Sequence, residues 1–216
     1  ELVKALNDPR CKLVISHEAG DEGFEYAEWL KEYACEHQVD LRLVNTRISD
    51  PLRAVQADSQ APSLWDVYPF ADFITYPSLQ EGFGNAFLEA IYFRKPMMVN
   101  RYAIFVRDIE PLGFDLALMD GYLSKKTVQL VKEILANPER RNAMVDRNYA
   151  IARRHYSYTV LRERLSMLLR SLFGDAVDHL GPTPQAETDE GLLDIAPYQV
   201  HYRRFNRGAC SRRKAS

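Results

Sequence analysis

The chain has 216 residues, 46% hydrophobic and 27% charged, which is long enough and apolar enough to bury a substantial core. Its formal net charge of −2 argues against a protein built to wrap nucleic acid. The cysteines Cys11, Cys35 and Cys210 form no CxxC pair, which excludes a recognisable zinc or disulfide framework and fits the reduced thiols of a cytoplasm. No apolar run approaches the roughly 18–20 residues of a membrane helix.

Strands and helices alternate through the first half of the chain. Strands are predicted at residues 12–16, 41–44, 72–76, 96–100 and, more weakly, 116–119. Helices are predicted at the start of the chain and over residues 22–37, 64–70 and about 84–93, with Ser63 as a plausible N-cap. Strands that alternate with helices imply βαβ units, so the predicted class is α/β, a doubly wound parallel sheet.

Helical patterns dominate after Ser124, and we expect helices over residues 124–137, 138–157 and 159–173. Pro138 stands where a first-turn proline belongs. We therefore divide the chain into a domain over residues 1–173 and an extension over 174–216, which we expect to be partly disordered. The extension ends in a basic cluster, for which two interpretations are open: contact with phosphate or an acidic surface, and a solvated terminus.

The stretch PSLQEGFGNAFLEA at residues 77–90 carries the strongest chemical signal. It follows a predicted strand, so its turn is expected at the carboxyl end of that strand, where α/β sheets bind ligands. Ionised Glu81 and Glu89 can each accept two hydroxyl hydrogen bonds, and glycine at 82 and 84 lets backbone approach a ligand. The simpler alternative makes Glu81 a helix-start acid and Glu89 a solvated surface residue.

The conjunction of these features resembles the E-x7-E region of retaining GT-B glycosyltransferases of the GT4, or group 1, family. The resemblance covers roughly residues 1–173 and is strongest at 71–99, in ADFITYPSLQEGFGNAFLEAIYFRKPMMV. It implies the Rossmann-like, donor-binding half of a GT-B fold followed by C-terminal helices. A sugar would move from a nucleotide-diphosphate sugar to an acceptor hydroxyl without a protein nucleophile or metal cofactor.

By this resemblance, Glu81 is the catalytic candidate and would bind hydroxyls of the donor sugar. Glu89 would hold the ribose, and backbone N–H groups of Phe83, Gly84 and Asn85 would meet the sugar and diphosphate. The implied donor site comprises Ser78, Glu81, Gly82, Phe83, Gly84, Asn85 and Glu89. His17 and Arg47, which follow the first two strands, are weaker candidates. A structural role at the strand end is the favoured alternative for His17, and a loop-capping role is equally open to Arg47.

The chain opens on Glu1 inside a helix-like pattern, so we expect a fragment of a longer protein. The family's phosphate-binding Arg and Lys would then lie before residue 1. An N-terminal domain there would bind the acceptor, which is a sugar, a lipid or a small molecule. On that view the fragment alone is inactive, and any membrane association of this otherwise cytoplasmic protein belongs to the missing part.

The sequence departs from the family pattern at two places. Arg94 replaces the glycine that usually follows the helix, where a left-handed turn is unfavourable for a residue with a Cβ, so a different turn is expected. Residues 100–105, NRYAIF, replace a glycine-rich loop. These departures leave open a non-catalytic nucleotide- or sugar-binding module. A GT-B-like sugar-nucleotide epimerase is a further alternative because it shares the architecture, although the E-x7-E arrangement argues against it. Trp65 and Tyr68 are expected in the core rather than as a base-stacking platform.

Overall fold

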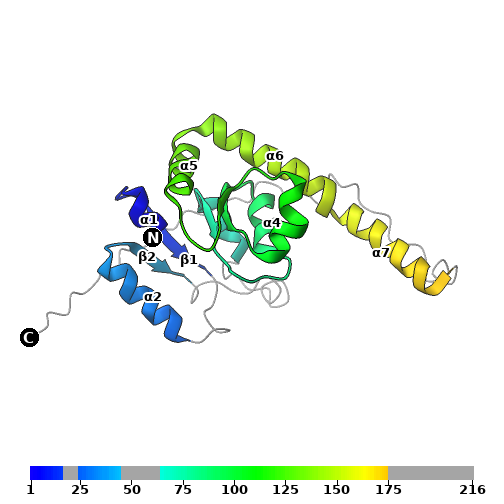
Figure 1. Cartoon of the computed structure of the whole chain (residues 1–216), viewed down its shortest axis with the longest axis horizontal. Helices are drawn as coiled ribbons and strands as arrows, with labels where there is room; N and C mark the ends of the chain where they lie inside the picture. Colours follow the sequence, from blue (N-terminus) through cyan, green and yellow to red (C-terminus); the bar gives the residue numbers. More distant parts are fainter. Residues whose placement is uncertain (17–23, 45–63, 175–216) are drawn as a thin grey trace, which may run out of the picture. The chain divides into compact units, whose positions relative to one another are not determined.

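The computed structural model describes residues 1–16, 24–44 and 64–174 (Figure 1). The chain divides into two compact units, Glu1–Ala152 and Arg153–Ser216. The predicted boundary after residue 173 adjoins residues outside the described part and stays a prediction. The predicted fold class is confirmed: the described strands pair in parallel, and helices connect them.

The first unit begins with α1 (Leu2–Leu6), β1 (Lys12–Ile15), α2 (Phe24–Glu36) and β2 (Asp40–Leu43). Strands β1 and β2 pair in parallel, with Lys12 opposite Asp40 and Ile15 opposite Leu43. Parallel neighbours need a crossover connection, and α2 is part of that connection. Helix α2 packs on β2 through the face that carries the buried Ala34.

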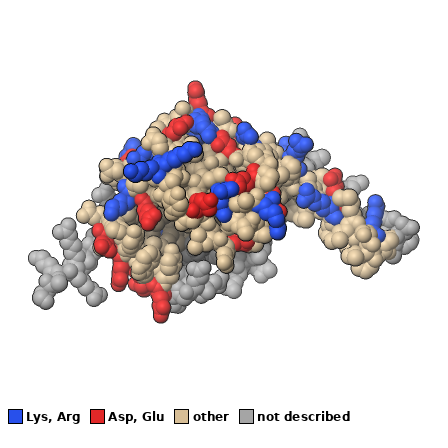
Figure 2. Space-filling view, in the orientation of Figure 1, with Lys and Arg blue, Asp and Glu red and all other residues tan. Residues whose placement is uncertain are grey.

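The outer surface of α2 is acidic and aromatic. Acidic side chains gather at the lower left of Figure 2, where Figure 1 places α2; the helix contributes Glu25, Glu28, Glu32 and Glu36. Beside them Trp29 stacks between Tyr26 and Tyr33, with ring centroids 5.7 and 5.1 Å apart. These rings cover one another, and such pairs three and four residues apart stabilise a helix.

The second group of strands is β3 (Ile74–Tyr76), β4 (Met97–Asn100) and β5 (Ala117–Met119), in the order β3-β4-β5 and all parallel. Every residue of the central β4 is buried, as expected for a parallel strand covered on both faces. The described strands hydrogen-bond in two groups, β1-β2 and β3-β4-β5.

Successive residues of β4 point into two different cores. Met97 and Val99 pack with Phe87 and Ile91 of α4 (Asn85–Tyr92). Met98 packs instead with residues of α5 (Lys125–Ala136), such as Val131. Because side chains alternate across a strand, helices cover both faces of this sheet, which is the doubly wound arrangement.

The predicted helix over residues 64–70 was wrong. Two short 3-10 helices stand there, η2 (Leu64–Asp66) and η3 (Tyr68–Phe70). Pro69 lacks the N–H that a longer helix would require. Tyr68 is a core residue as predicted, with 9% of its surface exposed, whereas Trp65 is 47% exposed. The predicted N-cap, Ser63, lies outside the described residues.

Between β4 and β5 the chain forms a π-helical turn, η4 (Phe105–Ile109), and a 3-10 turn, η5 (Glu110–Leu112). Helix α6 (Pro138–Tyr156) starts at the predicted proline. It is tied to the segment before β5 by buried Asn148, which exchanges two hydrogen bonds of 2.7 Å with the backbone of Asp115. The second unit contains α7 (Tyr158–Phe173), capped by Ser157.

Candidate functional site

The predicted motif forms a turn between β3 and α4. Strand β3 ends at Tyr76, and α4 begins at Asn85 with Gly84 as its N-cap. The turn therefore lies at the carboxyl end of β3 and leads into the N-terminus of a helix, whose first N–H groups lack intrahelical partners. Such a position favours anionic or hydroxyl ligand oxygens.

Glycine is required at position 84. Its φ is +91°, and an added Cβ would lie 2.8 Å from Tyr76 Oη and 3.0 Å from Tyr102 Oη. The Tyr102 hydroxyl donates a 2.8 Å hydrogen bond to the backbone carbonyl of Phe83, which helps to hold the turn in this conformation. At Gly82 an added Cβ would meet no atom within 4 Å, so the protein's own packing does not explain that glycine.

Glu81 is half-buried and faces a tyrosine. Burial raises the pKa of Tyr76, and hydrogen bonding to Glu81 raises it further. The first turn of α4 contains no acidic residue, so Glu81 stands in the loop before the helix. The simpler interpretation of Glu81 as a helix-start acid therefore does not describe its position.

Glu89 is half-buried in α4 and accepts a 2.8 Å hydrogen bond from the hydroxyl of Tyr68. The Tyr68 ring is stacked on Phe93, with centroids 4.9 Å apart and planes 5° apart. Burial raises the pKa of Tyr68, and the hydrogen bond and negative charge of Glu89 raise it further. The carboxylate of Glu89 is therefore positioned by a hydrogen bond from Tyr68, and Glu89 is not a solvated surface acid.

Asn100, the last residue of β4, ties three strand ends together. Its Nδ2 donates 3.0 Å to the Ser78 carbonyl, and its Oδ1 accepts 2.8 Å from the N–H of Gly121. The side chain is 3% exposed, so both of its polar atoms are used where water is excluded. Sequence reasoning placed Asn100 at the end of a predicted strand and the start of a departing loop but gave it no role, although an amide ending an otherwise apolar strand was a usable signal.

The residues after β4 replace the expected glycine-rich loop with a packed, charged one. Tyr102 and Phe105 are 2% and 1% exposed. Arg101 contacts two carboxylates, with N–O distances of 3.0 Å to both Glu110 and Asp120. A cation therefore stands at the carboxyl edge of the sheet, paired with one acid from the β4–β5 connection and one that directly follows β5.

The expectation of a different turn at Arg94 was wrong, because Arg94 does adopt the left-handed conformation, with φ 51°. The N–H of Arg94 bonds Ile91, and the N–H of Lys95 bonds Ala90, which is the pattern of a Schellman ending. The Arg94 guanidinium pairs with Asp146 and lies 4.0 Å from the ring centre of Tyr149. These contacts offset the backbone cost that a Cβ brings.

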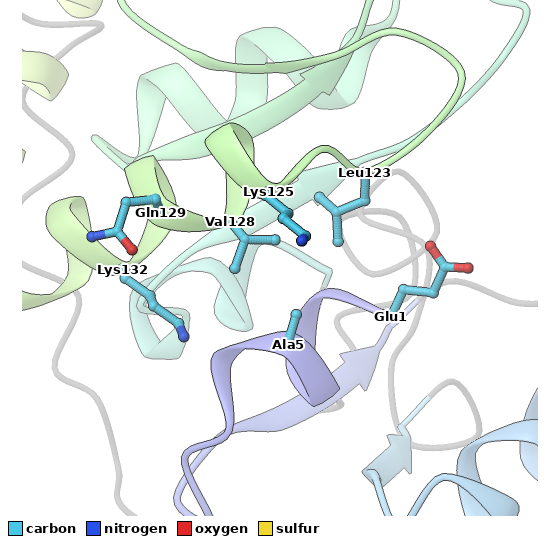
Figure 3. A pocket seen from close by; sticks show the side chains of 7 residues that line it. All are labelled: Glu1, Ala5, Leu123, Lys125, Val128, Gln129 and Lys132. Atoms are coloured by element: carbon cyan, nitrogen blue, oxygen red, sulfur yellow. The ribbon is translucent and has the colours of Figure 1, made fainter.

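The remaining predicted candidates, His17 and Arg47, lie outside the described residues. An open pocket of about 460 Å³ lies between α1 and α5 and contains none of the predicted site residues (Figure 3). Across residues 1–16, 24–44 and 64–174, no group of three or more His, Cys, Asp or Glu side chains is arranged to hold a metal. No helix in these same ranges is long and apolar enough to cross a membrane.

Comparison with known proteins gives a family. The model of the family described as "Glycosyl transferases group 1" matches residues 1–151. The chain is 48% identical over 95 residues to the mannosylglucosylglycerate synthase of Petrotoga mobilis, covering 44% of this chain and 21% of that protein. It is 32% identical over 158 residues to the mannosylglucosylglycerate synthase of Thermotoga maritima, covering 67% of this chain and 35% of that protein. The chain thus spans about a third or less of these relatives.

Proposed function

The chain belongs to the group 1 glycosyltransferase family, and we propose that it forms the donor-binding part of a retaining glycosyltransferase. That enzyme moves a sugar from a nucleotide-diphosphate sugar to an acceptor hydroxyl. The family match covers residues 1–151, which include the whole turn from Ser78 to Glu89.

One observation carries the proposal. Two half-buried glutamates flank the N-terminal end of α4 beside the carboxyl end of β3, and each interacts with a buried or half-buried tyrosine. A neutral polyol offers only hydroxyl groups, and a carboxylate held at a fixed angle is a strong acceptor for them. We assign Glu89 to the ribose and Glu81 to the donor sugar, following the order that the family resemblance implies.

The backbone supplies the remaining donor contacts. The N–H groups of Phe83, Gly84 and Asn85 precede or open α4, where the helix dipole favours negative charge on a diphosphate. The departing diphosphate accumulates charge in the transition state, so donors already aimed at it lower the barrier. Gly82 leaves open space at the turn, which suits a ligand that approaches the backbone there.

The reaction needs no protein nucleophile in this proposal. The acceptor hydroxyl attacks on the face from which the diphosphate leaves, and the protein holds both substrates in register. The retaining course and the absence of a metal rest on the resemblance of residues 77–90 to retaining group 1 enzymes. Both relatives are mannosylglucosylglycerate synthases, which makes a mannosyl-containing glycoside of glycerate the first product to test.

Binding by the 216-residue chain tests the donor site. We expect one of ADP, GDP or UDP to raise the melting temperature, and its sugar conjugates to bind at the same place. Glu89→Gln should weaken binding of the free nucleotide, since an amide accepts a ribose hydroxyl more weakly than a carboxylate does. Glu81→Gln should leave the free nucleotide nearly unaffected and reduce discrimination between sugars.

Two results would contradict this assignment. One is a chain that no nucleotide stabilises, although circular dichroism shows it folded. The other is a pair of glutamate variants that both bind every ligand as the parent chain does.

A further inference from the structure

Glu89 of the candidate site accepts a hydrogen bond from the Tyr68 hydroxyl, and we infer that Tyr68 is a positioning residue for Glu89. The tyrosine occupies part of the acceptor capacity of the carboxylate and leaves the rest for a ligand hydroxyl. This inference rests on the proposed donor site and assigns to it a residue outside the 77–90 motif.

The Tyr68–Glu89 pair is rigid on the tyrosine side. The ring is nearly parallel to that of Phe93 at 4.9 Å, and the residue is 9% exposed, so neighbouring groups restrict its rotation. An ionised carboxylate has no proton to give, so the phenol is the donor to Oε2 over 2.8 Å. This hydrogen bond restricts rotation of the Glu89 carboxylate about its last side-chain bond, and the orientation of Oε1 is restricted with it.

The Tyr68 phenol remains a protonated donor at neutral pH. Burial is the largest cause that raises its pKa above the ordinary value of 10, and Glu89 acts in the same direction. A carboxylate fixed before the ligand arrives loses less conformational freedom on binding, a cost of about 0.5–1.5 kcal/mol per side chain. That range corresponds to about a two- to tenfold effect on affinity.

Tyr68 acts on the part of the site assigned to the ribose, so discrimination between sugars is an internal control for Tyr68→Phe. Calorimetry on the full chain would compare ADP, GDP and UDP with their 2′-deoxy forms, to measure the preference for ribose. Mannose and glucose conjugates of the best-bound nucleotide would measure sugar discrimination. We expect Tyr68→Phe to reduce the ribose preference about two- to tenfold with little change in sugar discrimination.

Phenylalanine keeps the ring of Tyr68, and Tyr92→Phe, at a half-buried tyrosine of α4, is a matched control that should change neither the ribose preference nor sugar discrimination. In a Glu89→Gln background, Tyr68→Phe should change the ribose preference little further, because the two side chains act as one unit. A merely structural Tyr68 would lower the melting temperature and leave the ribose preference intact.

The outcomes separate this inference from the function beneath it. If the unmodified chain binds no nucleotide, the proposed function fails, and this inference fails with it. If the unmodified chain prefers ribose and Tyr68→Phe leaves that preference unchanged or increases it, the donor site stands and the positioning role is wrong.

Discussion

The buried side-chain amide of Asn100 donates a hydrogen bond to the backbone carbonyl of Ser78, joining the end of β4 to the turn that carries Glu81. The same amide accepts from Gly121, just beyond β5. One side chain thus sets the spacing of three chain segments at the edge of the sheet where the candidate site lies. The geometry of the site depends on this residue although no ligand contact is proposed for it.

Asn100→Asp should destabilise the fold by roughly 1–3 kcal/mol at neutral pH, because a carboxylate cannot donate to the Ser78 carbonyl and places two acceptors together. Urea denaturation measures the loss. Lowering the pH should recover part of it, since a protonated carboxyl can donate again. Asn100→Leu is the matched comparison and should show a loss with no such recovery. An Asp variant as stable as the parent chain would contradict the assigned bonds.

The α/β class could be predicted from the sequence because, in the second half of the fold, the alternation of strands and helices agrees with the residues that mark where each element begins. Strand β4 is a short apolar run beginning just after a proline, and α5 has a capping serine whose Oγ accepts from the N–H of Thr127 at 3.0 Å. The structure of residues 64–70 was harder to predict. Their aromatic residues have helical spacing, but Pro69 limits the length of any helix there. The π-helical turn at Phe105–Ile109 had no periodic signal of its own.

Gly84→Ala should destabilise the fold by about 1–3 kcal/mol, since the backbone has φ +91° and the new Cβ would press on Tyr76 and Tyr102. Gly82→Ala, with open space around it, should leave the melting temperature nearly unchanged. Differential scanning calorimetry of the two variants compares them directly. Equal losses at both positions would show that the turn in solution differs from the one described.

The two candidate glutamates were easier to single out than the tyrosine that holds one of them. Glu81 and Glu89 lie in one short motif, and the conjunction of its features with the resemblance to the group 1 family singled them out. Tyr68 is 21 positions from Glu89 and was predicted as plain core, because nothing in the local sequence shows which polar group a buried hydroxyl will meet. That pairing depends on how η3 and α4 pack, which is tertiary information.

Arg94→Gly should be more stable than Arg94→Ala by about 1–2 kcal/mol, because glycine adopts φ 51° without the steric cost of a Cβ. Both variants lose the exposed ion pair with Asp146 and the contact with Tyr149, so those losses cancel in the comparison. Midpoints of urea denaturation give the difference. If alanine and glycine are equivalent, the helix does not end in a left-handed turn.

Acid should weaken the first unit through two carboxylates whose pKa values are lowered in the folded state. The hydrogen bond from Arg10 lowers the pKa of Asp8 from 3.8 to about 2. The hydrogen bond from Arg42 lowers the pKa of Asp40, and the charge of Lys12, which lies opposite Asp40 in the strand pair, acts in the same direction. A carboxylate with a lowered pKa binds fewer protons when folded than when unfolded. Its contribution to stability is therefore complete above the ordinary pKa and is lost as the pH falls through the folded value.

The melting temperature of the chain should accordingly fall as the pH drops from about 4 towards 2, and less steeply in the Asp8→Asn/Asp40→Asn double variant. Both ion pairs are substantially exposed, with the Arg10 side chain at 89%, so the difference between parent and variant should be small. Added salt should shrink it further, because screening acts on exposed pairs. Parallel pH curves for parent and variant would show that these pairs do not couple protonation to folding.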